Sequence, residues 1–473
     1  MRRLPRNFIP ILAVICVAAC AVVFVDFGGT VASASAEGPP IPLPEFTEYK
    51  IPDNDFSEQI TKETGSSLKR EYLDLGALVV GILLASLFAL VIRSRRGLLL
   101  LAVVSLAWLG FWREGCVCAI GAIQNVTLAV ANPDYAIPAV VLAFFTIPLI
   151  STLLFGRTFC AAVCPLGAIQ ELVALRPVKV PKWLDHALGL FAYVYLGLAV
   201  ALAATGTAFL ICRYDPFVAF FRRTGDTNML IFGGCFLLLG VFVARPYCRY
   251  LCPYGALLGI LSKLSWRHLK IPPTDCINCR LCEDSCPYGA IDEPTVDQSL
   301  DKRPQARRRL VCLLLLLPPL IGGGALLGIM CEKPLGQLDP TICLAEEVRA
   351  DIAKQEAAAD DTTADVDVPE EEITDTLDAF RTTGPTVEKL FEQAAEKSNM
   401  LRTAGGWLGA WIGLVLGIKL IHLSIRRKRT DYQPVRANCV SCGRCFWYCP
   451  NETDIQRLVP IQTADTNTTR EEQ

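Results

Sequence analysis

The sequence has few charged residues and almost no histidine. Only 19% of its 473 residues are Asp, Glu, Lys or Arg, whereas a soluble globular chain carries about 25%. Together with a mean hydropathy of +0.39, this deficit excludes an ordinary soluble enzyme. The net charge of -2 provides none of the basic field that nucleic-acid binding requires, so nucleic acid is excluded as a partner.

Several catalytic signatures are also missing. The chain has no Gly-rich phosphate loop, no Ser/His/Asp constellation and no His-Glu-x-x-His motif, so hydrolytic and nucleotide-driven chemistry have no visible residues. The three histidines, His186, His268 and His422, do not have the spacing of paired haem ligands in a helical bundle. For His186, a structural role at the membrane interface is favoured over that of a proton acceptor at a quinone site.

Long apolar runs, in contrast, are abundant. Eight are candidates to cross a hydrocarbon core of about 30 Å, and they lie near residues 8–25, 75–92, 97–112, 136–155, 187–212, 229–244, 310–330 and 405–424. The first has a basic start and is followed by Ala34-Ser35-Ala36, which is typical of a signal peptide, but we favour an uncleaved anchor. We therefore expect an all-α polytopic protein of about eight spans in the lipid bilayer.

Lysine and arginine are concentrated in alternate loops, which predicts the orientation. They follow the second, fourth, sixth and eighth runs, and this face is cytoplasmic by the positive-inside rule. The opposite face receives residues 331–400, which contain 18 Asp and Glu against 6 Lys and Arg. The pattern predicts a multi-pass protein of the bacterial inner membrane with an acidic periplasmic segment.

Twenty-one cysteines require a metal or redox explanation, and eight of them form two matching runs. Each run has the C-x2-C-x2-C-x3-C-P spacing of bacterial ferredoxins, in which the fourth cysteine binds the other cluster. The spacing predicts two [4Fe-4S] clusters in a small cytoplasmic α+β ferredoxin-like module. One cluster is expected on Cys276, Cys279, Cys282 and Cys449, and the other on Cys439, Cys442, Cys445 and Cys286.

The alternative for these runs is a zinc site. Zinc sites pair two C-x2-C units, whereas each run here has three close cysteines and a fourth before proline, which favours iron-sulfur clusters. Two spans and the acidic segment separate the runs. These spans must therefore form a hairpin that returns the second run to the first.

A shorter motif, C-x3-C-P, occurs at the cytoplasmic ends of the fourth and sixth runs. It contains Cys160 and Cys164 in one copy and Cys248 and Cys252 in the other, which indicates duplicated hairpins. These four cysteines could together bind a third iron-sulfur centre, or they could act as a dithiol pair or as structural thiols.

Another group of cysteines lies at the opposite ends of the spans. Cys116, Cys118 and Cys212 are candidates for iron ligation or redox cycling, although three ligands are too few for a closed tetrahedral site. Cys331 and Cys343 lie in the acidic segment, where an oxidising compartment favours a disulfide between them.

The C-x3-C-P pair, the segment Cys212-Arg-Tyr-Asp-Pro-Phe217 and the ferredoxin runs together resemble the membrane polyferredoxins of the NapH and NosR type. The resemblance covers roughly residues 75–300 and 435–455. It implies an electron-transfer component of an oxidoreductase, such as a quinol dehydrogenase subunit. Residues 27–72 are too short for the periplasmic flavin domain of the NosR type, and no flavinylation-like Ser/Thr-Gly-Ala-Thr is found, so covalent FMN is not expected.

These patterns predict a membrane-bound iron-sulfur protein that carries electrons between a cytoplasmic or quinol donor and a periplasmic or membrane redox protein. The alternative is a redox-dependent assembly or maturation factor for a metalloenzyme. The predicted organisation is an anchor or signal peptide (1–26), a short periplasmic segment (27–72), a membrane bundle with the C-x3-C-P motifs (73–270), the first half of the ferredoxin module (271–300), a span (310–330), an acidic periplasmic insertion (331–403), a span (404–425) and the second half of the module (430–460).

Overall fold

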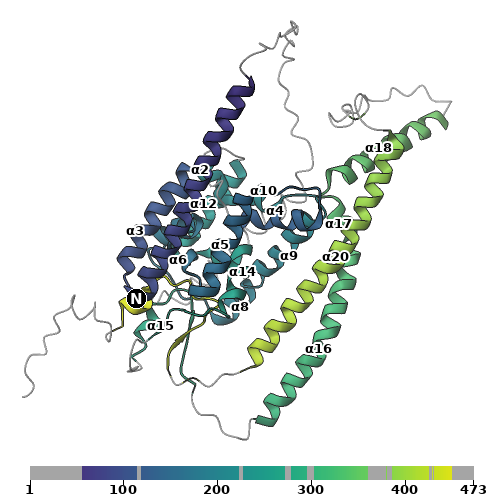
Figure 1. The fold of residues 1–473 in the computed structure, drawn as a ribbon. Coiled ribbons are helices and arrows are strands. Elements are labelled where there is room, and N and C mark those ends of the chain that lie inside the picture. The colour runs from purple at the N-terminus through teal and green to yellow at the C-terminus, as the bar shows by residue number, and fades with distance from the viewer. Residues whose placement is uncertain are drawn as a thin grey trace, which may run out of the picture. The chain divides into compact units, whose positions relative to one another are not determined.

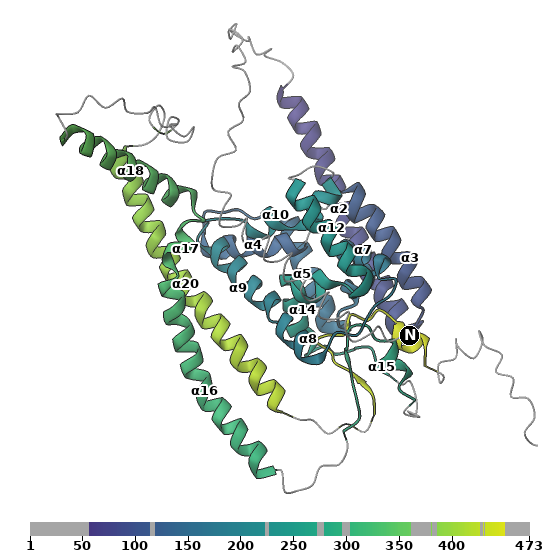
Figure 2. The same ribbon diagram turned by 180° about the vertical axis from the view of Figure 1, so that it is seen from behind.

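The computed structural model describes residues 56–113, 119–222, 227–271, 279–295, 303–360, 380, 386–425, 429 and 431–449. These residues are predominantly helical (Figures 1 and 2). The predicted first span and three of the candidate cysteines, Cys116, Cys118 and Cys276, lie outside this part of the chain. The chain divides into two units, Met1–Thr64 and Gly65–Gln473, and all the contacts below lie within the second.

Five helical stretches in the described residues are long and apolar enough to cross a membrane: Arg70–Val91, Arg95–Trp112, Lys182–Ala204, Gln305–Met330 and Val387–Ser424. The runs predicted near 136–155 and 229–244 form the shorter apolar helices α5 (Ala139–Phe155) and α12 (Thr227–Phe242). Two further short apolar helices, α4 (Ala119–Ala131) and α14 (Pro253–Ser262), were not expected from the sequence. The chain is therefore a membrane protein that combines long and short apolar helices.

The first two long stretches form a hairpin. Helix α2 (Phe56–Ser86) continues into the π-helical segment η1 (Leu87–Val91), and α3 (Arg95–Ser105) continues into η2 (Leu106–Trp112). Ser94 caps α3 by accepting a hydrogen bond from the Gly97 amide. Small hydroxyl side chains join this hairpin to helix α6 (Thr158–Ala162). Ser86 forms a hydrogen bond with the Thr158 hydroxyl, and Ser105 donates a hydrogen bond to the carbonyl of Val163 at the end of α6.

The two C-x3-C-P motifs occupy equivalent places in the fold. In the first copy, α5 leads through α6 to α7 (Pro165–Val173); in the second, α12 leads through α13 (Pro246–Tyr250) to α14. Helices α7 and α14 both begin at the proline of the motif, which is favoured at the first helical position because its missing N–H has no partner there. The last two cysteines of the motifs, Cys164 and Cys252, are thus the N-caps of two short helices.

Helices α8 (Lys182–Leu188) and α9 (Phe191–Ala204) form the next span, which is followed by α10 (Leu210–Tyr214) and α11 (Pro216–Arg222). A second hairpin consists of α16 (Arg303–Met330) and α20 (Val387–Ser424), with α17 (Glu332–Gly336) and α18 (Pro340–Asp360) between them. Glycines bring its two backbones into contact, because a Cβ atom on Gly324, Gly328 or Gly409 would overlap the facing carbonyl group. Helix α20 also packs on α9, where Trp411 donates a hydrogen bond of 2.9 Å to the Tyr193 carbonyl.

This second hairpin returns the chain to the first ferredoxin run. Strands β1 (Ile291–Asp292) and β2 (Gln433–Pro434) pair antiparallel, with Ile291 opposite Pro434. Helices α15 (Leu281–Ser285) and α21 (Arg444–Trp447) lie within the same two runs, which share one hydrophobic cluster. The residues around 280–292 and 432–446 therefore form one module, although more than a hundred residues separate them in the sequence.

One prediction about this region is wrong. Cys331 and Cys343 carry separate thiols, and the predicted disulfide between them is not formed. Cys331 precedes α17, whereas Cys343 lies on α18 and donates to the Gln337 carbonyl at 3.3 Å. An oxidising compartment permits a disulfide but does not orient the two side chains toward each other.

Candidate metal centres

The first candidate centre lies where the two ferredoxin runs meet. Cys286, the last cysteine of the first run, is within electrostatic range of Cys439, Cys442 and Cys445 of the second run. The four residues are buried or half-buried. The chain thus brings together the four cysteines that the ferredoxin spacing had grouped.

Backbone amides surround these sulfur atoms. The Cys286 sulfur accepts hydrogen bonds from the amides of Tyr288, Gly289 and Ala290, a turn in which Gly289 has a φ of 58°. In the second run, Cys439, Cys442 and Cys445 accept from the amides of Ser441, Arg444 and Phe446, respectively. Amide hydrogen bonds to sulfur are a main way in which proteins tune iron-sulfur clusters, so the donor set fits such a group.

Burial acts strongly on these thiols. It raises the pKa of Cys439 to about 11 and that of Cys442 to about 12. A buried thiolate is therefore unfavourable here unless positive charge lies beside it. Iron supplies such charge, and cluster binding would then displace the thiol protons.

The other expected cluster is described only in part. Cys279 is exposed, Cys282 and Cys449 are buried, and Cys276 lies outside the described residues. Across the described residues, no three His, Cys, Asp or Glu side chains are close enough together to hold a single metal ion. A [4Fe-4S] cluster binds each thiolate at a different iron, so its ligands stand further apart than those of one zinc ion.

The second candidate centre is formed by the four C-x3-C-P cysteines. Cys252 is within electrostatic range of Cys160, Cys164 and Cys248. The sulfur of Cys252 accepts from the Gly255 amide at 3.2 Å, and that of Cys248 accepts from the Gln170 side chain at 3.3 Å. Burial raises the pKa of Cys248 to about 12 and that of Cys252 well above its usual range, so thiolates at this site require positive charge beside them. We call these four cysteines the four-thiol site.

Two arginines lie across the repeats at this site. Arg157 and Arg245 both precede the first cysteine of their motif by three residues. Arg245 donates to the carbonyl groups of Cys160 and Ala161 in the other copy, whereas Arg157 donates at 2.8 Å to the carbonyl of Ala437, near the second ferredoxin run. These arginines were not among the residues predicted from the sequence. The signal was present as Arg-x-x-Cys-x3-Cys-Pro-x-Gly, which occurs twice.

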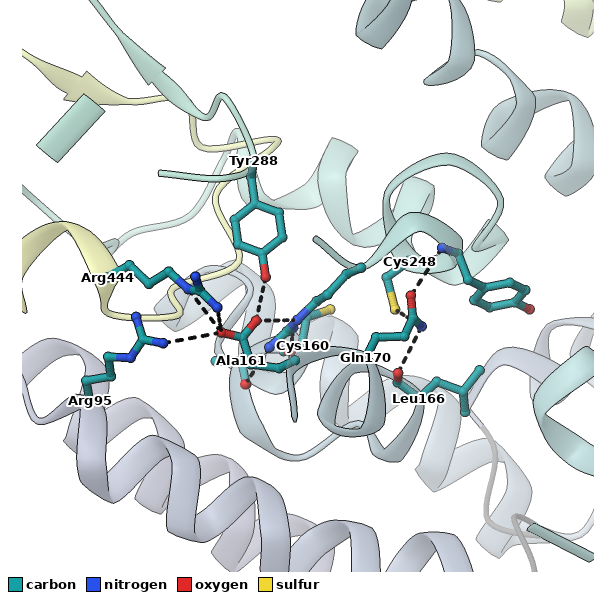
Figure 3. A network of polar contacts seen from close by, with 11 residues as sticks. Arg95, Cys160, Ala161, Leu166, Gln170, Cys248, Tyr288 and Arg444 are labelled. Atoms are coloured by element: carbon teal, nitrogen blue, oxygen red, sulfur yellow. Dashed lines mark hydrogen bonds and ion pairs between the residues drawn. The ribbon is translucent and has the colours of Figure 1, made fainter. Parts of the chain in front are cut away.

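Glu171 of α7 connects the two candidate centres. Its buried carboxylate accepts from Arg245 at 3.1 Å, from Arg444 at 2.9 Å and from the Tyr288 hydroxyl at 2.6 Å. Arg95 forms a longer ion pair with it, at 3.8 Å (Figure 3). Burial alone would raise the pKa of Glu171, but Arg245, Arg444 and Tyr288 together lower it to about 2. Glu171 is therefore ionised at any physiological pH, and we call these five residues the Glu171 network.

The outer candidate cysteines are represented by Cys212 of α10, which is exposed. Its sulfur lies 3.3 Å from the position that a Cβ atom on Gly121 would take, at the start of α4. The Gln124 side chain accepts from the amides of Ile211 and Cys212, much as Gln170 accepts from the Tyr247 amide beside Cys248. The surroundings of Cys212 thus repeat part of the four-thiol site.

An aromatic pair lies next to the four-thiol site. Tyr247, next to Cys248, packs edge-to-face on Phe217 of α11 with ring centroids 5.3 Å apart. Tyr195 of α9 is within electrostatic range of both Cys252 and Cys212. Tyr195 is therefore close to both the four-thiol site and Cys212.

Comparison with known proteins assigns both C-x3-C-P segments and the first ferredoxin run to iron-sulfur binding. One 4Fe-4S binding domain matches residues 137–183 and again 226–272, and a second 4Fe-4S binding domain matches residues 269–292. The two copies of the first domain contain the two C-x3-C-P motifs. No solved structure matches this chain.

Three relatives show how much of the chain is shared. Protein NirI of Paracoccus denitrificans is 32% identical over 42% of this chain and 31% of its own length. The uncharacterized protein MJ0750 of Methanocaldococcus jannaschii is 31% identical over 40% of this chain and 80% of its own. The methylamine utilization ferredoxin-type protein MauN of Paracoccus denitrificans is 31% identical over 36% of this chain and 61% of its own. The chain thus spans about a third of NirI and most of MJ0750.

Proposed function

Because this chain belongs to the family of membrane-bound ferredoxin-type proteins with 4Fe-4S binding domains, we propose that it links a cytoplasmic or quinol donor to a periplasmic redox partner. Its 4Fe-4S domains and apolar helices make it an iron-sulfur electron-transport protein of the membrane. The observation that carries the proposal is that both ferredoxin runs and both C-x3-C-P motifs meet at one buried network of charges around Glu171.

In this proposal the ferredoxin module holds two clusters whose ligands cross between the runs. Cys286 joins Cys439, Cys442 and Cys445 at one of them, which is supported by their proximity and by the amides directed at their sulfur atoms. Cys276, Cys279, Cys282 and Cys449 hold the other. When bound, such clusters supply one-electron chemistry at potentials set by burial and by hydrogen bonds to sulfur.

The four-thiol site is the third centre of the proposal. Cys160, Cys164, Cys248 and Cys252 come from two repeats that a 4Fe-4S binding domain matches, and they approach one another at two helix N-termini. Gln170 and Gly255 donate hydrogen bonds to two of the four sulfur atoms. This donor set suits an iron-sulfur centre better than a pair of inert structural thiols.

A path to the outer face completes the proposal. A hydrocarbon core of about 30 Å is too thick for efficient transfer in a single step, so a relay is needed. The Tyr247–Phe217 pair and Tyr195 support a path toward Cys212, with Cys116 and Cys118 as further outer residues. In the alternative, electrons stop at the inner face, where a membrane quinone is the donor or acceptor.

The proposed orientation places the ferredoxin module in the cytoplasm of a bacterial cell and α17 and α18 in the periplasm. It is supported by the lysine- and arginine-rich loops, which the positive-inside rule assigns to the cytoplasm. One of these loops contacts the module through Lys179, which pairs with Asp284 at 2.8 Å, and Lys182, which pairs with Glu293 at 3.1 Å.

The test is electron transfer across a sealed membrane. The protein is reconstituted anaerobically in liposomes that enclose an impermeant electron acceptor, and an impermeant reductant is added outside. We expect reduction of the enclosed acceptor by the parent protein and slower reduction by the Cys164→Ser variant. If the two proteins pass electrons at the same rate while their ferredoxin clusters are intact, the four-thiol site is not part of the path.

A further inference from the structure

Four of the five members of the Glu171 network come from, or lie beside, the two C-x3-C-P motifs and the two ferredoxin runs. Glu171 follows the first C-x3-C-P motif on α7, and Arg245 precedes the second. Tyr288 follows Cys286 at the end of the first ferredoxin run, and Arg444 lies between Cys442 and Cys445 in the second. Figure 3 shows Tyr288, Arg444 and Arg95 directed at one point beside Cys160 and Ala161.

The charges in this network do not cancel. One carboxylate faces three guanidinium groups, and the side chains of Arg245, Glu171 and Arg444 are only 1%, 4% and 11% exposed. A single ion pair would need one arginine, and excess buried positive charge is costly unless negative charge lies nearby. The structure therefore contains positive charge that Glu171 alone does not neutralise.

The excess charge faces thiols on both sides. Arg245 is within electrostatic range of Cys248 in the four-thiol site and of Cys442 in the second ferredoxin run. Arg444 is likewise within range of Cys442. Clusters held by four thiolates carry net negative charge, and their potentials depend on the charge around them. Water and salt screen interactions at this depth only weakly.

We propose that Glu171, Arg245 and Arg444 form one shared countercharge for two redox centres, the four-thiol site and the site of Cys286, Cys439, Cys442 and Cys445. This inference rests on the proposed function, because it requires both sites to hold redox groups. Glu171 is then a positioning residue: it holds the two arginines between the sites and sets how much of their positive charge each site experiences. The potentials of the two centres are therefore tuned together.

A network that only stabilised the fold would use the same hydrogen bonds. The test must therefore change the charge of the network while it keeps the size of the side chains. The Glu171→Gln variant keeps the size of the side chain and one oxygen acceptor but removes the negative charge. We expect it to retain the iron of the parent protein and to shift the midpoint potentials of both centres to more positive values, because the arginine charges are no longer offset. The readout is a redox titration of the anaerobically purified full chain followed by low-temperature EPR.

A second variant provides the opposite sign. Arg95 is partly exposed and lies at the edge of the network, so Arg95→Gln disturbs packing less than a change at Arg245 would. Removing its positive charge should move both potentials to more negative values, by less than the Glu171→Gln shift. If Glu171→Gln fails to fold, Arg95→Gln still tests the inference.

The matched control is Asp74→Asn. Asp74 is also a buried carboxylate paired with an arginine, Arg113, and it accepts from Trp108 at 3.1 Å. Asp74 lies on α2 and contacts Trp108 in η2, which at a rise of 1.5 Å per residue is on the order of 20 Å from Arg95. Asp74→Asn should leave both potentials unchanged.

The outcomes separate this inference from the proposed function. A parent protein without an EPR or thiol-redox signal from the four-thiol site contradicts the third centre of the proposed function, and the shared countercharge with it. A parent protein with both signals, whose potentials stay fixed in Glu171→Gln and Arg95→Gln, contradicts the shared countercharge alone. Opposite shifts of the two centres within one variant would also overturn it.

Discussion

The helices around the thiol sites and the hairpin of α16 and α20 are both rich in apolar residues, but different interactions hold them together. Around the thiol sites, buried polar side chains such as Glu171, Arg245 and Gln170 make directed hydrogen bonds between distant segments. In the hairpin, glycine backbones touch directly, and none of the apolar window of α16 is buried within the described chain. Charge and hydrogen-bond geometry should therefore govern the first region, and side-chain size the second.

The hairpin has a simple role in this comparison. It carries the chain away from the first ferredoxin run and returns it so that β2 pairs with β1. Close packing of small residues suits a segment that faces lipid, where no hydrophobic force drives helices together. The thiol sites, by contrast, need particular residues at particular positions.

Cysteine substitutions should have the largest effect, which is the loss of a cluster when the cysteine lies at a thiol site and no loss when it lies in the hairpin. Cys286→Ala removes a ligand that the proposal assigns to the cluster of the second run, so that cluster should be lost while the cluster of Cys276, Cys279 and Cys282 remains. Cys312→Ala in α16 is the control, because Cys312 lies on the exposed surface of the hairpin. Iron analysis and EPR measure both. Loss confined to the first run's own cluster would refute the crossed ligation.

Deleting the carboxylate of the Glu171 network should strongly destabilise the fold. Glu171→Ala leaves the buried guanidinium groups of Arg245 and Arg444 without their anion. Breaking a buried ion pair in this way costs roughly 3–5 kcal/mol. Thermal unfolding in detergent, followed by circular dichroism, should show a clear loss of stability relative to Glu171→Gln, which retains an acceptor. An unfolding temperature of Glu171→Ala equal to that of the parent protein would mean that the network does not stabilise the protein.

A size change in the hairpin should have a smaller and purely steric effect. Gly324→Leu places a side chain against the backbone of Gly409, whereas Gly323→Leu, one residue earlier, points into open space. Overpacking of this kind costs about 1–3 kcal/mol. We expect Gly324→Leu to lower the unfolding temperature and Gly323→Leu to leave it unchanged, with parental EPR spectra in both. Altered cluster spectra in Gly324→Leu would show that the hairpin does more than connect the two runs.

The smallest effect concerns pH. The pKa of Glu171 is lowered from 4.5 to about 2, so its contribution to stability is complete above pH 4.5 and is lost as the pH falls toward 2. The difference in unfolding temperature between the parent protein and Glu171→Gln should therefore be the same at pH 7 and pH 5 and shrink only in stronger acid. A difference that already shrinks between pH 7 and pH 5 would indicate a carboxyl group of ordinary or raised pKa.

The sequence predicted the parts of the site that local patterns encode. Cysteine spacing grouped Cys286 with the second run, because the ferredoxin motif itself specifies that the fourth cysteine turns away from its neighbours. The Glu171 network was missed because Arg245 and Arg444 lie 74 and 273 residues from Glu171 in the sequence. The presence of opposite charges does not reveal pairing over such separations. The Cys331–Cys343 disulfide was predicted from the compartment only, and helices α17 and α18 place the two thiols apart.

The most direct test of the central claim is the metal content of the purified chain. Anaerobically isolated protein should contain at least about eight iron atoms and a matching amount of acid-labile sulfide per chain, as expected for two [4Fe-4S] clusters. After reduction, low-temperature EPR should give signals of more than one cluster, with additional iron if the four-thiol site is occupied. Protein that contains zinc instead of iron, or that gives no cluster signal in its fully folded form, would contradict the account.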